Sequence, residues 1–198
     1  MVTWAPTMRK ALARSQLSAA SWIWRAAAPG GSGRLPLPSA MRALRYDRYG
    51  PPDVLELVEI DEPVPRAGEL KVRVRAASLN PLDAKIRAGH TRLLPMFERP
   101  PRGTGVDFAG EVVGTGGGEV GGYYPGARVF GMVSPFRRAG TFAEFVCATP
   151  GEIATTPESL DDEHAAALPV AGGTAVQALA DEARLASGMR VLVNGAAG

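Results

Sequence analysis

Cysteine and histidine are scarce in this sequence. Cys147 is the only cysteine among 198 residues, and His90 and His164 are the only histidines. A single cysteine excludes an intrachain disulfide, and the three residues together are too few for a zinc site built from thiolates and imidazoles. We expect Cys147, in the stretch AEFVCATP, to be a small buried side chain in a strand. His90 is expected in a loop and His164 on the surface of a helix.

Long apolar runs and early acidic residues are also missing. No stretch approaches the roughly 18 consecutive apolar residues that a membrane-spanning helix needs, so the sequence predicts no membrane span. No acid precedes residue 46, and seven of the 22 lysines and arginines lie in that region. The other 15 basic residues are accompanied by 20 acidic ones, so the rest of the chain is acidic overall. A basic surface that binds nucleic acid is therefore not expected there.

Residues 1–40 differ in composition from the rest of the chain. They are rich in arginine, alanine and serine, as organellar transit peptides are. The stretch APGGSGRLPLPS would end any helix before Met41. Two interpretations stay open: residues 1–40 are the transit peptide of a mitochondrial or plastid protein, or Met41 begins a cytoplasmic protein. In both cases we predict that residues 1–40 form a disordered tail outside the fold.

Short strands separated by turns are the main pattern from Met41 to about residue 157. In LKVRVRAASLN, Leu70, Val72 and Val74 alternate with charged side chains, which is the period of two that a strand requires. Similar stretches are MRALRYD, LELVEID, GVDFAGEVVGTG, ARVFGMV and GTFAEFVCAT. Several strands at this spacing predict a β-barrel or sandwich in which one face of each strand packs a core.

The pattern changes after residue 157. Ser159 is predicted to cap a short helix whose first turn is acidic. A second, alanine-rich helix is predicted over residues 170–187 and should end at Gly188. A buried strand is then predicted over residues 190–194. Because a helix followed by a buried strand is typical of α/β domains, we expect a second domain to begin near the end of the chain.

Two glycine-rich stretches fit a phosphate-binding turn to different degrees. GGGEVG matches the pattern G-x-G-x-x-G, but Pro125 and Gly126 stand where the phosphate-binding helix would begin. We therefore interpret it as a hairpin loop. VLVNGAAG, at the end of the chain, follows a predicted helix and runs from apolar residues into glycines. That order is typical of the strand and turn that open a dinucleotide-binding unit.

Several stretches in a fixed order resemble a known family. They are MRALRYDRYGPPDVLEL, VRAASLNPLDAKIRAG, GVDFAGEVVGTG, GARVFG, GTFAEFV, AAALPVAGGTAVQAL and VLVNGAAG. In these stretches the chain is similar to the N-terminal portion of zinc-independent medium-chain dehydrogenases/reductases, the zeta-crystallin-like quinone oxidoreductases. The resemblance implies a mainly β GroES-like barrel, like the N-terminal domain of alcohol dehydrogenases, over residues 41–165. It also implies that residues 166–198 are the truncated start of an α/β Rossmann domain.

The same resemblance implies an activity and the residues that carry it. Members of this family pass hydride from NADPH, or NADH, to a quinone or an activated carbon–carbon double bond, without zinc. Asn80 matches an asparagine beside the nicotinamide, so a role in catalysis and in cofactor binding is expected for it. Thr174, Ala197 and Gly198 match positions that contact the cofactor. A homodimer is expected for the full-length protein.

The remaining residues of the matched segments are assigned more modest roles. Zinc-dependent relatives carry a cysteine near Asn80 or Pro81 and a histidine near Asp107, and neither residue type is present here. Asp83 is interpreted as a capping residue and Lys85 as a surface lysine. Because the adenosine half of the cofactor would rest on Rossmann residues absent from this sequence, the chain alone should bind NADPH weakly. A non-enzymatic GroES-like binding module and an inactive truncated product stay open as alternatives.

Overall fold

The computed structural model describes residues 39–137 and 139–195. The predicted tail 1–40 lies outside the described residues except for its last two positions, and so do the predicted cofactor residues Ala197 and Gly198. Within the described part, no helix is long and apolar enough to cross a membrane.

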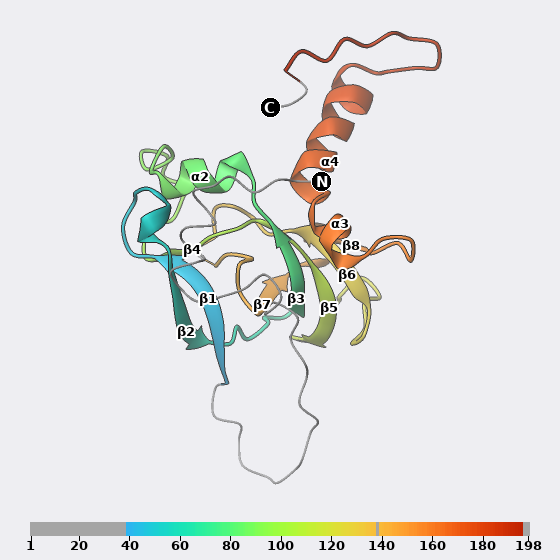
Figure 1. The fold of residues 1–198 in the computed structure, drawn as a ribbon. Helices are drawn as coiled ribbons and strands as arrows, with labels where there is room; N and C mark the ends of the chain where they lie inside the picture. Colours follow the sequence, from blue (N-terminus) through green and yellow to red (C-terminus); the bar gives the residue numbers. More distant parts are fainter. Residues whose placement is uncertain (1–38, 138, 196–198) are drawn as a thin grey trace.

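Two antiparallel sheets form the body of the molecule (Figure 1). The three-stranded sheet has the order β2-β1-β4, and its strands are β1 (Ala40–Tyr46), β2 (Glu56–Asp61) and β4 (Arg102–Gly103). The five-stranded sheet has the order β7-β3-β5-β6-β8, and its strands are β3 (Leu70–Ser78), β5 (Asp107–Thr115), β6 (Arg128–Met132), β7 (Phe145–Ala148) and β8 (Ile153–Thr155). Each of the six predicted strand stretches overlaps one of these strands, whereas the short strands β4 and β8 were not predicted.

Backbone hydrogen bonds join the two sheets along β1. The Leu44 N–H donates to the Phe142 carbonyl at 2.8 Å, and the Glu144 N–H donates to the Arg42 carbonyl at 3.1 Å. Because residues 142–144 lead directly into β7, these bonds connect the three-stranded sheet to an edge of the five-stranded one. The predicted mainly β barrel is confirmed.

The main core lies on one face of the five-stranded sheet. It comprises eight buried apolar residues: Leu70, Val72, Phe108, Val112, Val129, Val133, Val146 and Ala148. Val74 packs against this cluster, so the predicted apolar face of β3 is confirmed. On the opposite face of β5, Ala109 packs against Ala165 and Ala166 of a short helix. The start of β5 is therefore buried on both sides, which the alternating pattern of the sequence did not predict.

Short helical segments connect the strands and follow them. They are η2 (Pro52–Val54), α2 (Pro81–Arg87), η3 (Pro150–Glu152), α3 (Asp162–Ala166), α4 (Pro169–Val176) and the π-helical turn η4 (Gln177–Glu182). Helix α3 packs on the five-stranded sheet, whereas α4 and η4 project away from it (Figure 1).

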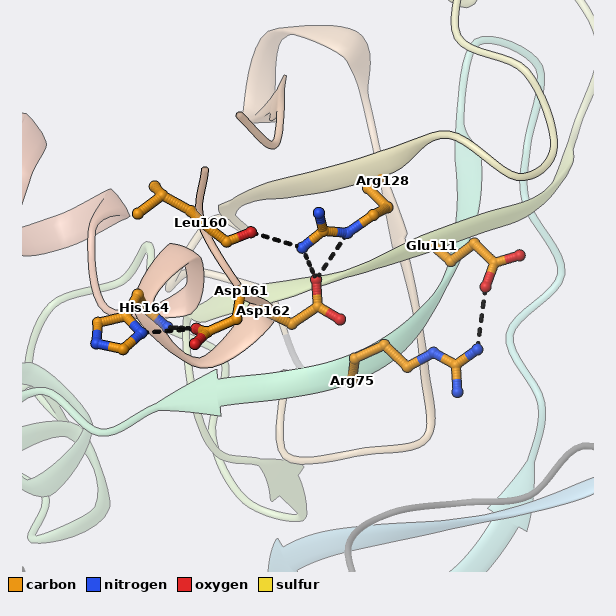
Figure 2. A network of polar contacts seen from close by, with 7 residues as sticks. All are labelled: Arg75, Glu111, Arg128, Leu160, Asp161, Asp162 and His164. Atoms are coloured by element: carbon orange, nitrogen blue, oxygen red, sulfur yellow. Dashed lines mark hydrogen bonds and ion pairs between the residues drawn. The ribbon is translucent and has the colours of Figure 1, made fainter. Parts of the chain in front are cut away.

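Polar contacts hold the start of α3 against the sheet, as Figure 2 shows. Arg128 of β6 donates to the Leu160 carbonyl at 2.9 Å and to the Asp162 carboxylate at 2.8 Å. Arg75 of β3 pairs with Glu111 of β5 at 3.0 Å on the same sheet. These pairs are partly exposed, so each is expected to contribute less than about 1 kcal/mol. The bonds from Arg128 fix where the chain enters α3, whereas the Arg75–Glu111 pair joins two strands of the sheet.

The cap of α3 is not the predicted one. Asp161, rather than Ser159, is the N-cap, and its carboxylate accepts from the His164 N–H at 2.8 Å. The chain makes a turn first, closed by a bond from the Leu160 N–H to the Pro157 carbonyl. This turn delays the helix by two residues and leaves Ser159 before it.

The end of the chain also differs from the prediction. The helical run that begins at Pro169 ends at Glu182 rather than at residue 187. Arg184 has a positive φ of 49°, which turns the chain out of the helix. Residues 190–194, predicted as a buried strand, form no strand, and Leu192 is 94% exposed. A strand requires a neighbouring strand to accept its hydrogen bonds, and the described residues provide none there.

The GGGEVG loop, the cysteine and the two histidines can be compared with their predicted positions. The stretch GGGEVG lies between the antiparallel neighbours β5 and β6, so it belongs to a hairpin connection as predicted. Cys147 lies in β7 but is half-buried, and burial is the main cause that raises the pKa of its thiol to about 11. His90 lies in a turn and His164 is exposed on α3, both as predicted.

Gly110 allows β3 and β5 to approach closely, and this leads to a first prediction. A Cβ at this position would lie 2.9 Å from the Arg73 carbonyl carbon and 3.1 Å from the Val74 Cα, and still closer to the Arg73 oxygen. These neighbours are backbone and cannot rotate away. We expect Gly110→Ala to lower the free energy of unfolding by about 1–3 kcal/mol in urea denaturation.

Gly114 provides the matched control on the same strand. A Cβ at Gly114 would meet nothing within 4 Å. Gly114→Ala should therefore leave stability unchanged or slightly raised, because alanine costs less conformational entropy than glycine. Equal effects of the two substitutions would contradict the close approach at Gly110.

Candidate functional site

Asn80 occupies the junction between β3 and α2. It is the N-cap of α2, and Pro81 follows at the first helical position, where its missing N–H costs nothing. The Asp83 carboxylate accepts from the Asn80 N–H at 2.8 Å. The interpretation of Asp83 as a capping residue is thus confirmed. Lys85, two residues further on, is exposed as predicted.

Asp107 lies beneath Asn80 and gathers three donors on one oxygen. It is the first residue of β5, stands opposite Ser78 in the register of β3 and β5, and is fully buried. Its Oδ2 accepts from the Ser78 hydroxyl at 3.2 Å and from the Asn80 side-chain amide at 3.0 Å. The third donor is the backbone N–H of Val170, at 3.2 Å. Residues from β3, the cap of α2 and the start of α4 therefore meet at a single carboxylate.

The bond to Asp107 determines what the Asn80 side chain can offer a ligand. A carboxamide nitrogen carries two hydrogens, and a carboxylate can accept only from this end of the amide. One hydrogen is held by Asp107, which leaves the other for a second acceptor. Asn80 is only 9% exposed, so its side chain is largely buried at this junction.

Helix α4 begins at the same carboxylate. The first N–H groups of a helix have no partner within the helix, and Asp107 supplies one for Val170. Thr174 lies four residues after Val170, so the two share one face of α4. Its side chain is exposed. Asp107 thus connects the predicted residue Asn80 to the first turn of α4, and the predicted residue Thr174 lies one turn further along that helix.

Burial raises the pKa of both carboxyl groups at this junction. For Asp107 desolvation is the largest cause, and the hydrogen bonds from Asn80, Val170 and Ser78 oppose it. For Asp83 desolvation raises the pKa from 3.8 to about 6, the bond from the Asn80 N–H opposes this, and the charge of Asp107 adds to it. The site therefore combines a neutral amide donor with two carboxyl groups that are harder to ionise than usual.

Two cavities in the described part of the barrel are not lined by Asn80. The larger, of about 300 Å³, lies between β1, β2 and β7 and is lined by apolar residues such as Met41, Ile60 and Phe145. The smaller, of about 10 Å³, lies beside Asp83. In the part of the chain that the structure describes, no cluster of three or more His, Cys, Asp or Glu side chains could hold a metal ion. The candidate site is thus a polar junction at the base of α4.

Sequence reasoning assigned no role to Asp107 or Ser78. A signal for Asp107 was present, because an acid stands among the apolar residues of GVDFAGEVV, and buried acids are rare unless they have partners. Its partners were not predictable, because they depend on the register of β3 with β5 and on the course of α4.

Comparison with known proteins identifies relatives of the chain. Residues 66–158 match the alcohol dehydrogenase GroES-like domain. A protein from Arabidopsis thaliana named chloroplast envelope quinone oxidoreductase homolog is 40% identical over 147 residues, which make up 73% of this chain and 44% of that protein. Mouse (Mus musculus) quinone oxidoreductase is 35% identical over 159 residues, covering 80% of this chain and 46% of that protein. The chain thus spans about half the length of these curated relatives.

Solved structures give the same result. The quinone oxidoreductase from Coxiella burnetii superimposes with a TM-score of 0.66 at 37% identity, over 76% of this chain and 47% of that one. The human synaptic vesicle membrane protein VAT-1 homolog-like protein superimposes with a TM-score of 0.69 at 32% identity, over 76% of this chain and 46% of that one.

Proposed function

Because the chain carries the alcohol dehydrogenase GroES-like domain and is related to the N-terminal portion of quinone oxidoreductases, we propose that it belongs to an NADPH-dependent reductase. The substrate class is a quinone or an enone, and the site is the junction of Asn80, Asp107 and α4. The observation that carries this proposal is the fixed Asn80 amide, which offers a neutral donor where the resemblance places the nicotinamide.

The residues of the junction fit a nicotinamide cofactor. Asn80 has one amide hydrogen committed to Asp107 and one left over, which suits the carboxamide oxygen of a nicotinamide or the carbonyl oxygen of a substrate. Thr174, exposed on the same side of α4 as Val170, adds a hydroxyl. When bound, the cofactor supplies the hydride. The chain's own residues orient the reacting groups, and solvent supplies the proton that completes reduction of the acceptor.

The proposed chemistry does not use zinc. The resemblance places the zinc-binding cysteine and histidine of other relatives near Asn80 and Asp107. These two residues are instead hydrogen-bonded to each other at 3.0 Å. A carboxamide nitrogen is a hydrogen-bond donor and offers no lone pair to a metal. The Asn80 amide and the Asp107 carboxylate therefore stand where the zinc-binding cysteine and histidine stand in those relatives.

We further propose that the full-length protein is a homodimer, as the resemblance implies.

The activity is tested on the protein purified from its source. Intact mass first gives the length of the native chain. NADPH oxidation is then followed by absorbance with several quinones and enones, and we expect turnover that requires both NADPH and the acceptor. Asn80→Ala should lower kcat/KM at least tenfold, or about 1.4 kcal/mol, because the fixed donor is lost. Lys85→Ala, on the exposed face of the same helix, should leave kcat/KM unchanged.

Absence of NADPH oxidation with every acceptor would overturn the proposed activity. A second candidate would then remain, a non-enzymatic GroES-like module that binds a protein partner. It is favoured by the exposed apolar side chains of the last described segment, which include Val176, Leu192 and Val193 at 60%, 94% and 60% exposure. A stable, monomeric 198-residue chain without NADPH binding would support this candidate.

A further inference from the structure

We propose that Asp107 is a positioning residue, which selects one orientation of the Asn80 amide and couples it to the start of α4. This inference rests on the proposed reductase function for its kinetic consequence, but its structural part stands independently of that function. The network itself consists of one buried oxygen with three donors, at 3.0–3.2 Å, from three different segments of the chain.

The orientation follows from the chemistry of the two side chains. The oxygen and nitrogen ends of a carboxamide are similar in size, so packing alone hardly distinguishes them. An ionised carboxylate accepts hydrogen bonds and would repel the amide oxygen. Asp107 therefore turns the nitrogen of Asn80 inward and holds it there. The remaining N–H of the same nitrogen is then the group that Asn80 presents, and the ligand atom it can recognise is an acceptor.

The coupling to α4 follows from the shared oxygen. The Val170 N–H and the Asn80 amide donate to the same Oδ2 of Asp107. When one donor moves, the other must therefore move as well to keep its hydrogen bond. The other carboxylate oxygen, Oδ1, is buried and has no hydrogen-bond partner among the described residues. The three bonds to Oδ2 must therefore offset most of the cost of burying this carboxylate. We infer that Asp107 fixes the distance between the Asn80 amide donor and Thr174, which lies one turn after Val170 in α4.

The first test is structural and uses the full-length protein labelled with ¹⁵N. The side-chain amide signals of Asn80 are identified by their loss in Asn80→Ala. In the wild type we expect these hydrogens to exchange slowly with solvent. Asp107→Ala should speed their exchange at least tenfold, whereas the isosteric Asp107→Asn should have an intermediate effect. Asp162→Asn, which removes an acid on α3, is the control and should leave the signals unchanged. Asn80 signals that do not respond to either Asp107 variant would overturn the inference.

The second test is a double-mutant cycle on NADPH oxidation. If Asp107 acts through Asn80, Asp107→Asn should lower kcat/KM about tenfold in the wild-type background and less than twofold in the Asn80→Ala background. A purely structural role would lower activity by the same factor in both backgrounds, and that result would overturn the inference. A wild-type protein without any NADPH oxidation would refute the proposed function, and the exchange experiment would then decide on Asp107 alone.

Discussion

Asn80→Asp should destabilise the barrel by about 3–5 kcal/mol at about pH 8 and by much less at about pH 5. The substitution replaces the amide nitrogen, 3.0 Å from the Asp107 carboxylate, with a second carboxylate oxygen. Two unit charges about 4 Å apart repel by about 4 kcal/mol at an effective dielectric constant of 20. The change in shape is minimal, so the effect isolates the charge at this junction.

The direction in which the stability of Asn80→Asp changes with pH follows from the proximity of two carboxyl groups. Two adjacent buried carboxyl groups raise each other's pKa, since both cannot ionise without cost. A group whose pKa is higher in the folded state than in the unfolded state stabilises the fold at low pH, and this contribution is lost as pH rises through the raised pKa. Urea denaturation of Asn80→Asp at the two pH values should reveal this loss.

Asn80→Ala serves as the control for this prediction. It removes the same hydrogen bond to Asp107 without adding a charge. Its destabilisation relative to wild type should therefore change much less with pH than that of Asn80→Asp. If Asn80→Asp instead lost the same stability at both pH values, the two side chains would not face each other as described.

The strands of the barrel could be predicted because their sequence carries a local signal. Leu70, Val72 and Val74 alternate with Lys71 and Arg73, and this period of two shows which side of the strand faces the core. Burial of the first two and packing of the third confirm the assignment. Such a signal depends only on residues that are neighbours in the chain, so it survives without knowledge of the tertiary structure.

The last segment could not be predicted in the same way. Val191, Leu192 and Val193 have the composition of a buried strand, yet they are 50%, 94% and 60% exposed. Composition indicates what a segment can bury, whereas a strand forms only when a neighbouring strand accepts its hydrogen bonds. The early end of the second helix is similar, because the positive φ of Arg184 has no signal in the sequence.

The candidate site likewise has a part that could be predicted from local sequence and a part that depends on the tertiary structure. Asn80 was identified from its motif, and its capping role with Asp83 is local, since the two lie three residues apart. Asp107 contacts Asn80 across 27 residues of sequence and Val170 across 63. These contacts depend on strand register and on the direction in which α4 leaves the barrel. The residue that organises the junction was therefore the one whose role could not be predicted.

Asp83→Asn should become more stable relative to wild type by about 3 kcal/mol as pH rises from about 4 to about 7. Desolvation raises the pKa of Asp83 from 3.8 to about 6 in the folded protein, and one pKa unit corresponds to about 1.36 kcal/mol. Because the folded pKa is raised, the wild type is stabilised by protonated Asp83 below about pH 4. It loses this contribution as pH rises through about 6. Asparagine does not titrate and retains an oxygen that can accept from the Asn80 N–H.

The measurement is the difference in free energy of unfolding between variant and wild type across this pH range. Taking the difference cancels the titrating groups that do not interact with Asp83, whereas the charge of Asp107 is one of the causes of the Asp83 shift and belongs to the measured effect. Asp161→Asn is the control with the opposite sign, because its bonds from His164 lower the pKa of that carboxyl in the folded state. Asp161→Asn should become less stable relative to wild type as pH rises. A constant difference for Asp83→Asn would mean that Asp83 ionises in the barrel as readily as in the unfolded chain, and the junction beneath Asn80 would then be solvated, contrary to the structure.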